Sequence, residues 1–128
     1  MRILLVEDHA STLSALGRLL RLRGHEVWFA RTLRAGSELC ETTHFDLIIC
    51  DLELPDGDGT SLGGIARRRG AVIVAITGYG LSEHRQRTDA AGFAAHLVKP
   101  LAIEELDAML NAVEKIRARR ANEDEREH

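Results

Sequence analysis

The segment that most constrains the fold is the apolar run Leu47-Ile48-Ile49-Cys50, which ends directly on Asp51. Pro55, Gly57 and Gly59 follow shortly after it and predict a turn. A continuous apolar run bounded by turn residues is typical of a strand that is buried on both faces of a parallel sheet. The pattern therefore places Asp51 at the carboxyl end of a central strand, which is the edge where open α/β sheets bind ligands.

Length, charge and cysteine content limit the classes of protein to which this chain can belong. The chain has 128 residues and a net charge of -3 with neutral histidines, which predicts one domain with one core and argues against a nucleic-acid-binding surface. No apolar run approaches the length of a membrane span, and Arg2 leads into a strand rather than a signal peptide. Cys40 and Cys50 are predicted to be free thiols. We expect a cytoplasmic domain with no nucleic-acid or membrane partner.

Apolar periodicity predicts five strands that alternate with five helices. The strands are expected at residues 3–6, 27–30, 46–50, 71–76 and 94–98, and the helices at residues 10–23, 33–41, 60–69, 82–91 and 103 to about 120. This alternation predicts a parallel sheet with helices on both faces. We expect helix 82–91, whose apolar face is thin, to be the easiest to shift. The domain should cover residues 1–120, and a polar C-terminal tail at 121–128 should fray into solvent.

Four of the predicted strands end in polar residues. Glu7 and Asp8 follow the first strand, Asp51 the third, Thr77 the fourth and Lys99 the fifth. Because the carboxyl ends of parallel strands share one edge of the sheet, these side chains should meet. Three carboxylates alone would force one of them to take up a proton, and a divalent cation relieves that conflict. A site of carboxylates and water without thiol or imidazole favours Mg²⁺ or Mn²⁺.

The residue types at this edge suit phosphoryl transfer. Asp51 is a carboxylate nucleophile that can form an acyl phosphate. Lys99 supplies a positive charge to the phosphoryl group, and the Thr77 hydroxyl donates a hydrogen bond to it. Gly78 leaves room beside that group. Such a site can accept a phosphoryl group without a dedicated catalytic base.

In this order, the motifs resemble the receiver domain of two-component response regulators, of the kind fused to hybrid histidine kinases or standing alone. The resemblance covers Met1 to about Arg120 and rests on Glu7-Asp8, Asp51-Leu-Glu-Leu-Pro-Asp-Gly-Asp-Gly, Thr77-Gly78 and Lys99-Pro100. It implies an α/β, flavodoxin-like, doubly wound sheet of five parallel strands in the order 2-1-3-4-5, with five helices.

The resemblance also implies a role for each residue of the phosphoryl site. Asp51 would be the phosphoacceptor, and Thr77 and Lys99 would contact the phosphoryl group. The bond between Lys99 and Pro100 would be cis, an isomer that is accessible at proline. The family's switch residue is often aromatic, and His96 takes its position here, which implies coupling between Thr77 and His96 and a weaker case for pH sensitivity.

For the metal, the resemblance implies that Glu7 and Asp8 form the acidic pair. Asp8 and Asp51 would bind Mg²⁺ through their carboxylates, and Glu53 would bind it through its main-chain carbonyl; Mn²⁺ would substitute. Glu53 and Tyr79 flank the predicted pocket at positions that tune the lifetime of the phosphoryl group in the family.

The function implied is a phosphorylation switch rather than an enzyme acting on other substrates. A histidine kinase or a histidine phosphotransfer protein would donate the phosphoryl group to Asp51. The added charge would shift the surface formed by helix 82–91, the His96 strand and the last helix, which would then engage a partner or a second copy of the domain.

Two other functions share the same residues and stay open at this level. One is a hydrolase that uses Asp51 on external phosphate esters, and the other is a passive interaction module of receiver fold. Asp56-Gly-Asp-Gly-Thr60 also spells the D-x-D-G-T motif of haloacid-dehalogenase-like phosphatases, but those enzymes need the first Asp directly after the strand. A calcium loop is excluded because Ser61 and Arg67 replace the required glycine and glutamate.

Overall fold

A five-stranded parallel sheet forms the centre of the protein. The computed structural model describes residues 1–78 and 81–127, except for the side chains of residues 81–85 and 127. The strands pair in the order β2-β1-β3-β6-β7, and every pairing is parallel. Their bounds are β1 Arg2–Val6, β2 Glu26–Ala30, β3 Leu47–Asp51, β6 Val72–Thr77 and β7 Ala95–Val98. With β6 and β7 as fourth and fifth strands, the predicted order 2-1-3-4-5 is confirmed.

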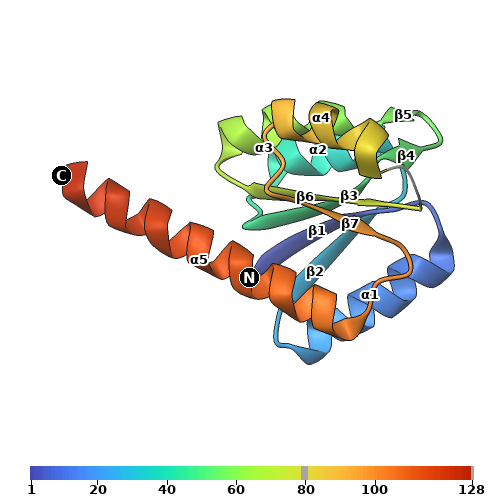
Figure 1. Cartoon of the computed structure of the whole chain (residues 1–128), viewed down its shortest axis with the longest axis horizontal. Coiled ribbons are helices and arrows are strands. Elements are labelled where there is room, and N and C mark those ends of the chain that lie inside the picture. Colours follow the sequence, from blue (N-terminus) through green and yellow to red (C-terminus); the bar gives the residue numbers. More distant parts are fainter. Residues whose placement is uncertain (79–80, 128) are drawn as a thin grey trace.

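Helices cover both faces of the sheet. Figure 1 shows α1 and α5 on one face and α2, α3 and α4 on the other. Their bounds are α1 Ala10–Leu22, α2 Leu33–Thr42, α3 Leu62–Arg69, α4 Leu81–Ala90 and α5 Ile103–Glu127. The segment after β3, for which the sequence predicts a turn, forms a short antiparallel hairpin followed by a 3-10 turn. These elements are β4 Glu53–Leu54, β5 Gly57–Asp58 and η1 Gly59–Ser61.

Local capping explains where several helices begin and end. The Thr32 side chain accepts a hydrogen bond from the Ala35 amide at 3.0 Å and so caps α2. Gly24 and Gly70 follow α1 and α3 with φ of 86° and 74°, a left-handed conformation that glycine adopts at low cost. The predicted capping residues are therefore confirmed.

Two layers of apolar side chains hold the sheet between its helices. Alternate strand residues point to opposite faces, so each central strand contributes to both layers. One layer includes Leu4, Val6, Ile48, Cys50, Ile73 and Ala75, and the other includes Ile3, Leu5, Leu47, Ile49, Val74 and Ile76. All of these side chains are buried. Burial on both faces is the physical reason that the central strands read as continuous apolar runs.

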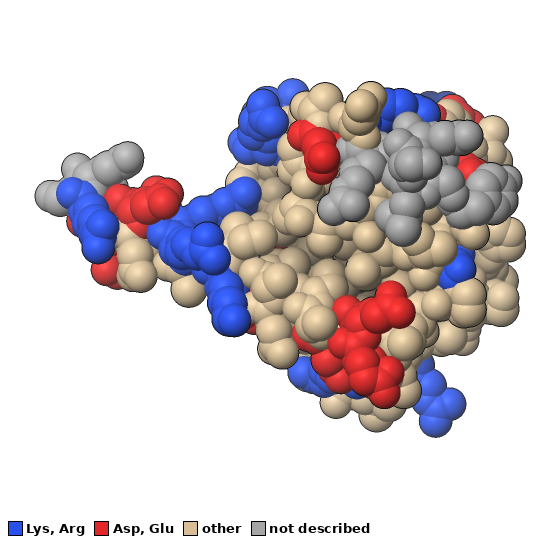
Figure 2. All heavy atoms as spheres, viewed as in Figure 1, with Lys and Arg blue, Asp and Glu red and all other residues tan. Residues whose placement is uncertain are grey.

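The C-terminal end differs from the expectation. Instead of fraying after Arg120, α5 continues to Glu127, and residues 121–126 are exposed (Figure 1). Figure 2 shows basic and acidic side chains beside one another along this projecting part. Arg120 and Asp124 are spaced four residues apart, a spacing at which opposite charges stabilise a helix. The prediction of a frayed tail is therefore wrong.

Candidate phosphoacceptor site

The side chains expected at the carboxyl edge of the sheet do meet. Lys99 Nζ donates a hydrogen bond to Asp51 Oδ2 at 2.9 Å and also bonds to Glu7 Oε1. Glu7 follows β1, Asp51 ends β3, and Lys99 follows β7. Glu7 and Asp51 are 0% and 2% exposed, so both carboxyl groups depend on protein partners instead of bulk water. The fold thus gathers three strand ends so that one partly buried ammonium group pairs with two buried carboxyl groups.

The loop after β3 orients the Asp51 carboxylate. Asp51 Oδ1 accepts a hydrogen bond from the Glu53 amide at 2.9 Å. The chain then returns so close to β3 that a Cβ atom added at Gly59 would lie 2.4 Å from the Asp51 carbonyl oxygen. Gly59 donates its amide hydrogen to the Leu52 carbonyl at 3.1 Å. Glycine at position 59 therefore permits the hairpin that holds the Glu53 amide against the carboxylate.

Burial and mutual contact separate the protonation states of the two buried carboxyl groups. Burial, together with the neighbouring Asp51, raises the pKa of Glu7 to about 7, although Lys99 opposes that change. Burial alone would also raise the pKa of Asp51. The effect of burial is outweighed by hydrogen bonds from the Glu7 carboxyl, the Glu53 amide and Lys99, which lower the pKa of Asp51. Without a bound cation, Asp51 is therefore the ionised partner, as a nucleophile must be.

A pH dependence of stability follows from Glu7. Its pKa in the folded protein exceeds its ordinary value of 4.5, so its contribution to stability is fully present below pH 4.5 and is lost as pH rises through about 7. We expect the metal-free protein to lose up to about 3 kcal/mol of unfolding free energy across this range. Urea unfolding at a series of pH values measures this loss of unfolding free energy.

The matched control for that measurement is Glu7→Gln, which removes the titrating group and keeps the shape. The variant should lose less stability than the wild type between pH 4.5 and 7. Asp51 contributes in the opposite sense, because its lowered pKa makes its stabilisation disappear only on acidification. Parallel curves for the two proteins would contradict the assignment to Glu7.

The acidic residues form a cluster that suits a cation. Glu7, Asp8, His9 and Asp51 each offer one ligand atom, and these atoms all lie within 4.8 Å of one another. Glu7 Oε2 and Asp8 Oδ1 are buried and accept no hydrogen bond from the described part of the chain. Buried carboxylate oxygens without a donor are costly, and a divalent cation would satisfy them. The residues present therefore fit a metal ion.

His9 was absent from the predicted site. It precedes α1 as the N-cap residue, and its Nδ1 atom lies 3.4 Å from Asp8 Oδ1 and 3.5 Å from Glu7 Oε1. An imidazole therefore lies beside the cluster for which the sequence predicts carboxylates and water alone. The sequence carried no distinct signal for it, because a residue directly before a helix reads as an ordinary N-cap position.

The predicted switch residues lie on adjacent strands. Thr77 is fully buried at the end of β6, and its carbonyl accepts a hydrogen bond from the Lys99 amide at 2.8 Å. His96 of β7 pairs with Ala75 of β6, and the Nδ1 atom of His96 lies 3.5 Å from the Thr88 hydroxyl of α4. His96 thus links β7 to α4, while its coupling to Thr77 stays a prediction. The Lys99–Pro100 bond is cis, and Tyr79 lies outside the described residues.

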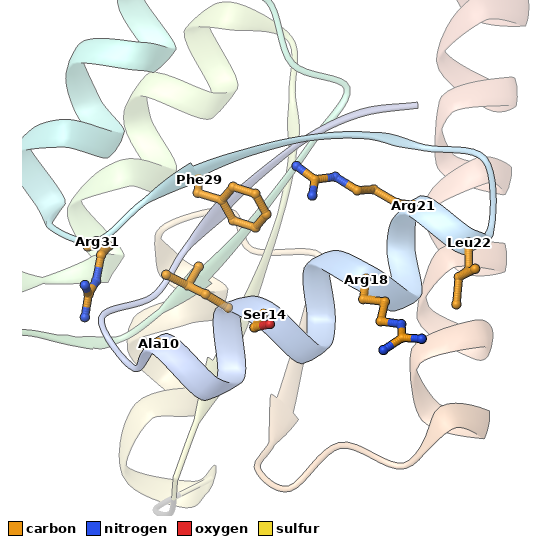
Figure 3. A pocket seen from close by; sticks show the side chains of 8 residues that line it. Ala10, Ser14, Arg18, Arg21, Leu22, Phe29 and Arg31 are labelled. Carbon is orange, nitrogen blue, oxygen red and sulfur yellow. The ribbon is translucent and has the colours of Figure 1, made fainter.

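A hollow lies elsewhere on the molecule. It has a volume of about 620 Å³ and follows α1 and the edge strand β2. Figure 3 shows Phe29 in its wall, with Arg18 and Arg31 toward opposite ends. Arg31 donates a hydrogen bond to the Asp8 carbonyl at 2.8 Å. Since Asp51 and Lys99 do not line this hollow, its size does not mark the phosphoacceptor site.

Comparison with known proteins decides the family. The model of the response regulator receiver domain matches residues 3–111. The chain belongs to this family. Receiver domains of two-component response regulators are phosphorylated on an aspartate, and Mg²⁺ binding is a general property of the family. They interact with histidine kinases or phosphotransfer proteins.

Curated relatives share the receiver but are longer proteins. The transcriptional regulatory protein PdtaR of Mycobacterium tuberculosis is 36% identical over 107 residues, which cover 82% of this chain and 52% of PdtaR. The transcriptional regulatory protein CusR of Escherichia coli is 35% identical over 115 residues, which cover 88% of this chain and 51% of CusR. This receiver therefore spans about half the length of these relatives. Because both are transcriptional regulators, the expected absence of a nucleic-acid partner is not confirmed.

Solved receivers share the fold. A CheY-like receiver domain protein from Methanospirillum hungatei superposes with a TM-score of 0.79 at 32% identity, covering 89% of this chain and 96% of that one. The chemotaxis response regulator CheY4 of Vibrio cholerae superposes with a TM-score of 0.79 at 28% identity, covering 88% and 97%. In the described part of this receiver, no helix combines the length and the apolar character needed to span a membrane.

Proposed function

We propose that Asp51 of this receiver accepts a phosphoryl group from a phosphohistidine and that the modified domain transmits the signal by a conformational change. The observation that carries the proposal is the state of the Asp51 carboxylate. One oxygen bonds to Lys99 and the other to the Glu53 amide, and the neighbouring Glu7 takes the raised pKa. A histidine kinase or a histidine phosphotransfer protein would be the donor.

In the transfer step, an oxygen of Asp51 attacks the phosphorus atom. A bond forms between that oxygen and phosphorus, the bond from phosphorus to the donor imidazole nitrogen breaks, and the imidazole departs with its electron pair. Lys99 already contacts the attacking carboxylate, so its ammonium group can follow the charge onto the phosphoryl oxygens without moving far. Thr77, buried at the end of β6, would donate its hydroxyl hydrogen to the same group. No separate base is needed, because the nucleophile carries no proton.

The acidic cluster would hold the cation that the reaction requires. We assign this role to the carboxylates of Glu7, Asp8 and Asp51 and to the main-chain carbonyl of Glu53. When bound, Mg²⁺, or Mn²⁺ in its place, supplies positive charge that offsets the charge of the transferring phosphoryl group. The buried oxygens of Glu7 and Asp8 that accept no hydrogen bond support this assignment.

The signal would leave through α4, β7 and α5. Phosphorylation adds a charge of roughly −1.5 to −2, which would draw Thr77 and Lys99 toward Asp51. Lys99 follows β7 directly, and β7 contacts α4 where His96 lies near Thr88. A shift at this face would expose a changed surface to a partner or to a second copy of the domain. We place the domain itself at residues 1–120 and its site of action in the cytoplasm, and we assign it no enzymatic activity on other substrates.

The chemistry of the modification tests this function. The full chain is incubated with acetyl phosphate and Mg²⁺, and its intact mass is followed. We expect at most one phosphoryl group per chain, no incorporation after the metal is chelated, and loss of the group on treatment with hydroxylamine, which cleaves acyl phosphates. Label that survives hydroxylamine would contradict an aspartyl phosphate. Repeated turnover of unrelated phosphate esters would favour the hydrolase instead.

A further inference from the structure

We propose that His9 is a metal ligand of this site and shifts its preference from Mg²⁺ toward transition-metal ions such as Mn²⁺ and Co²⁺. The inference rests on the proposed metal site and adds one residue to it. His9 lies in the acidic cluster, with its Nδ1 atom 3.4 Å from Asp8 Oδ1 and 3.5 Å from Glu7 Oε1. An imidazole at this place changes the chemistry of the donor set.

The separations match those of ligands that share one ion. Nitrogen and oxygen ligands bind a small divalent ion at about 2.0–2.2 Å, so two neighbouring ligands lie roughly 3.0 Å apart around an octahedral ion and roughly 3.4 Å apart around a tetrahedral one. The distance from His9 Nδ1 to Asp8 Oδ1 agrees with the larger value, whereas the Glu7 oxygen nearest His9 is the one that bonds to Lys99. The ligand atoms of all four residues, including Asp51, fall within 4.8 Å. The imidazole and the carboxylates would draw closer together around a shared ion.

Burial provides an independent argument that the cluster is built to receive a cation. Glu7 is 0% exposed, and its Oε2 atom accepts no hydrogen bond within the described residues. The other Glu7 oxygen already bonds to Lys99. The His9 side chain is 66% exposed, so it can turn toward an ion without disturbing the core.

The nitrogen donor is what separates the metals. Mg²⁺ favours oxygen ligands and keeps much of its water, whereas imidazole is a good ligand for the later divalent ions of the first transition row. Adding His9 to three carboxylates should therefore strengthen the binding of Co²⁺ while leaving that of Mg²⁺ nearly unchanged. The competing interpretation is that His9 only forms an ion pair with the acidic residues. It predicts that removing His9 strengthens the binding of every metal ion alike.

Calorimetric titration of the full chain with Mg²⁺, Mn²⁺ and Co²⁺ distinguishes these interpretations. The variant is His9→Gln. The matched control is His44→Gln, which changes an exposed histidine shortly before the amino end of β3, the end opposite to Asp51. We expect His9→Gln to weaken Co²⁺ binding by about tenfold or more, a loss typical of disturbed metal sites, and to leave Mg²⁺ affinity almost unchanged. Unchanged or stronger Co²⁺ binding in the variant, or an equal loss for Mg²⁺, would overturn the proposal.

Spectroscopy of bound Mn²⁺ gives a second readout. Electron spin echo modulation should show a coupled nitrogen in the wild type and in His44→Gln but not in His9→Gln, and its absence from the wild type would overturn the proposal. Acetyl phosphate labelling with Mg²⁺ separates this inference from the proposed function. The wild type and His44→Gln should both be labelled. A His9-dependent Co²⁺ site in a chain that takes no label would support the inference and reject the phosphoacceptor function.

Discussion

Asp51→Asn should accept no phosphoryl group under conditions in which the wild type gains one per chain. The substitution preserves size, and the amide oxygen can still accept the hydrogen bond that the Glu53 amide donates at 2.9 Å. An amide is not a nucleophile for this chemistry, because no ionised oxygen is left to form the acyl phosphate. We therefore expect a folded but unreactive protein. Intact mass after incubation with acetyl phosphate and Mg²⁺ measures the difference.

The matched control for this experiment is Asp124→Asn, the same chemical change at an exposed position of α5. It should be labelled like the wild type. Circular dichroism of all three proteins checks that the sheet and helices are retained. Equal label on Asp51→Asn and wild type would refute the acceptor assignment and move the reaction to another side chain.

Lys99→Met should combine a large loss of stability with retained Mg²⁺ binding. The substitution removes the ammonium group that bonds to both Glu7 and Asp51 and leaves two buried carboxyl groups in contact. Removing one partner of a buried ion pair lowers the unfolding free energy by about 3–5 kcal/mol. The 20% exposure of the Lys99 side chain reduces that figure. Since Mg²⁺ would neutralise the same carboxylates, adding it should recover much of the loss. Urea unfolding with and without Mg²⁺ measures both effects.

The phosphoryl reaction of Lys99→Met should also be slow, by roughly a hundredfold if the ammonium stabilises the transferring group as an oxyanion-hole donor does. The control is Lys115→Met, because Lys115 is the other lysine of the chain and lies exposed on α5. That variant should match the wild type in stability and labelling. If Lys99→Met also matches the wild type, the role assigned to Lys99 is wrong.

Much of the fold could be predicted from sequence, because strands and helices impose local periodicities. The central strands read as apolar runs because they are buried on both faces, as Leu47 and Ile48 are. Thr32 and Gly70 marked helix ends because capping involves only nearby residues. The meeting of Asp51 and Lys99 was also predictable, since parallel strands share a carboxyl edge and both residues sit where an apolar run stops.

Other features depended on contacts between distant residues and became visible only in three dimensions. His9 reads as an ordinary residue before a helix, and only the packing of β1 beside β3 brings it to the same cluster as Asp51. The order of the two buried pKa values depends on burial and on the bonds of Lys99, neither of which is a local property. Sequence alone therefore determined the elements and the edge where the chemistry lies, because these follow from neighbours along the chain. The tertiary structure decided which of the two buried carboxyl groups has the raised pKa and which imidazole lies beside the acidic cluster, because both depend on distances that only folding sets.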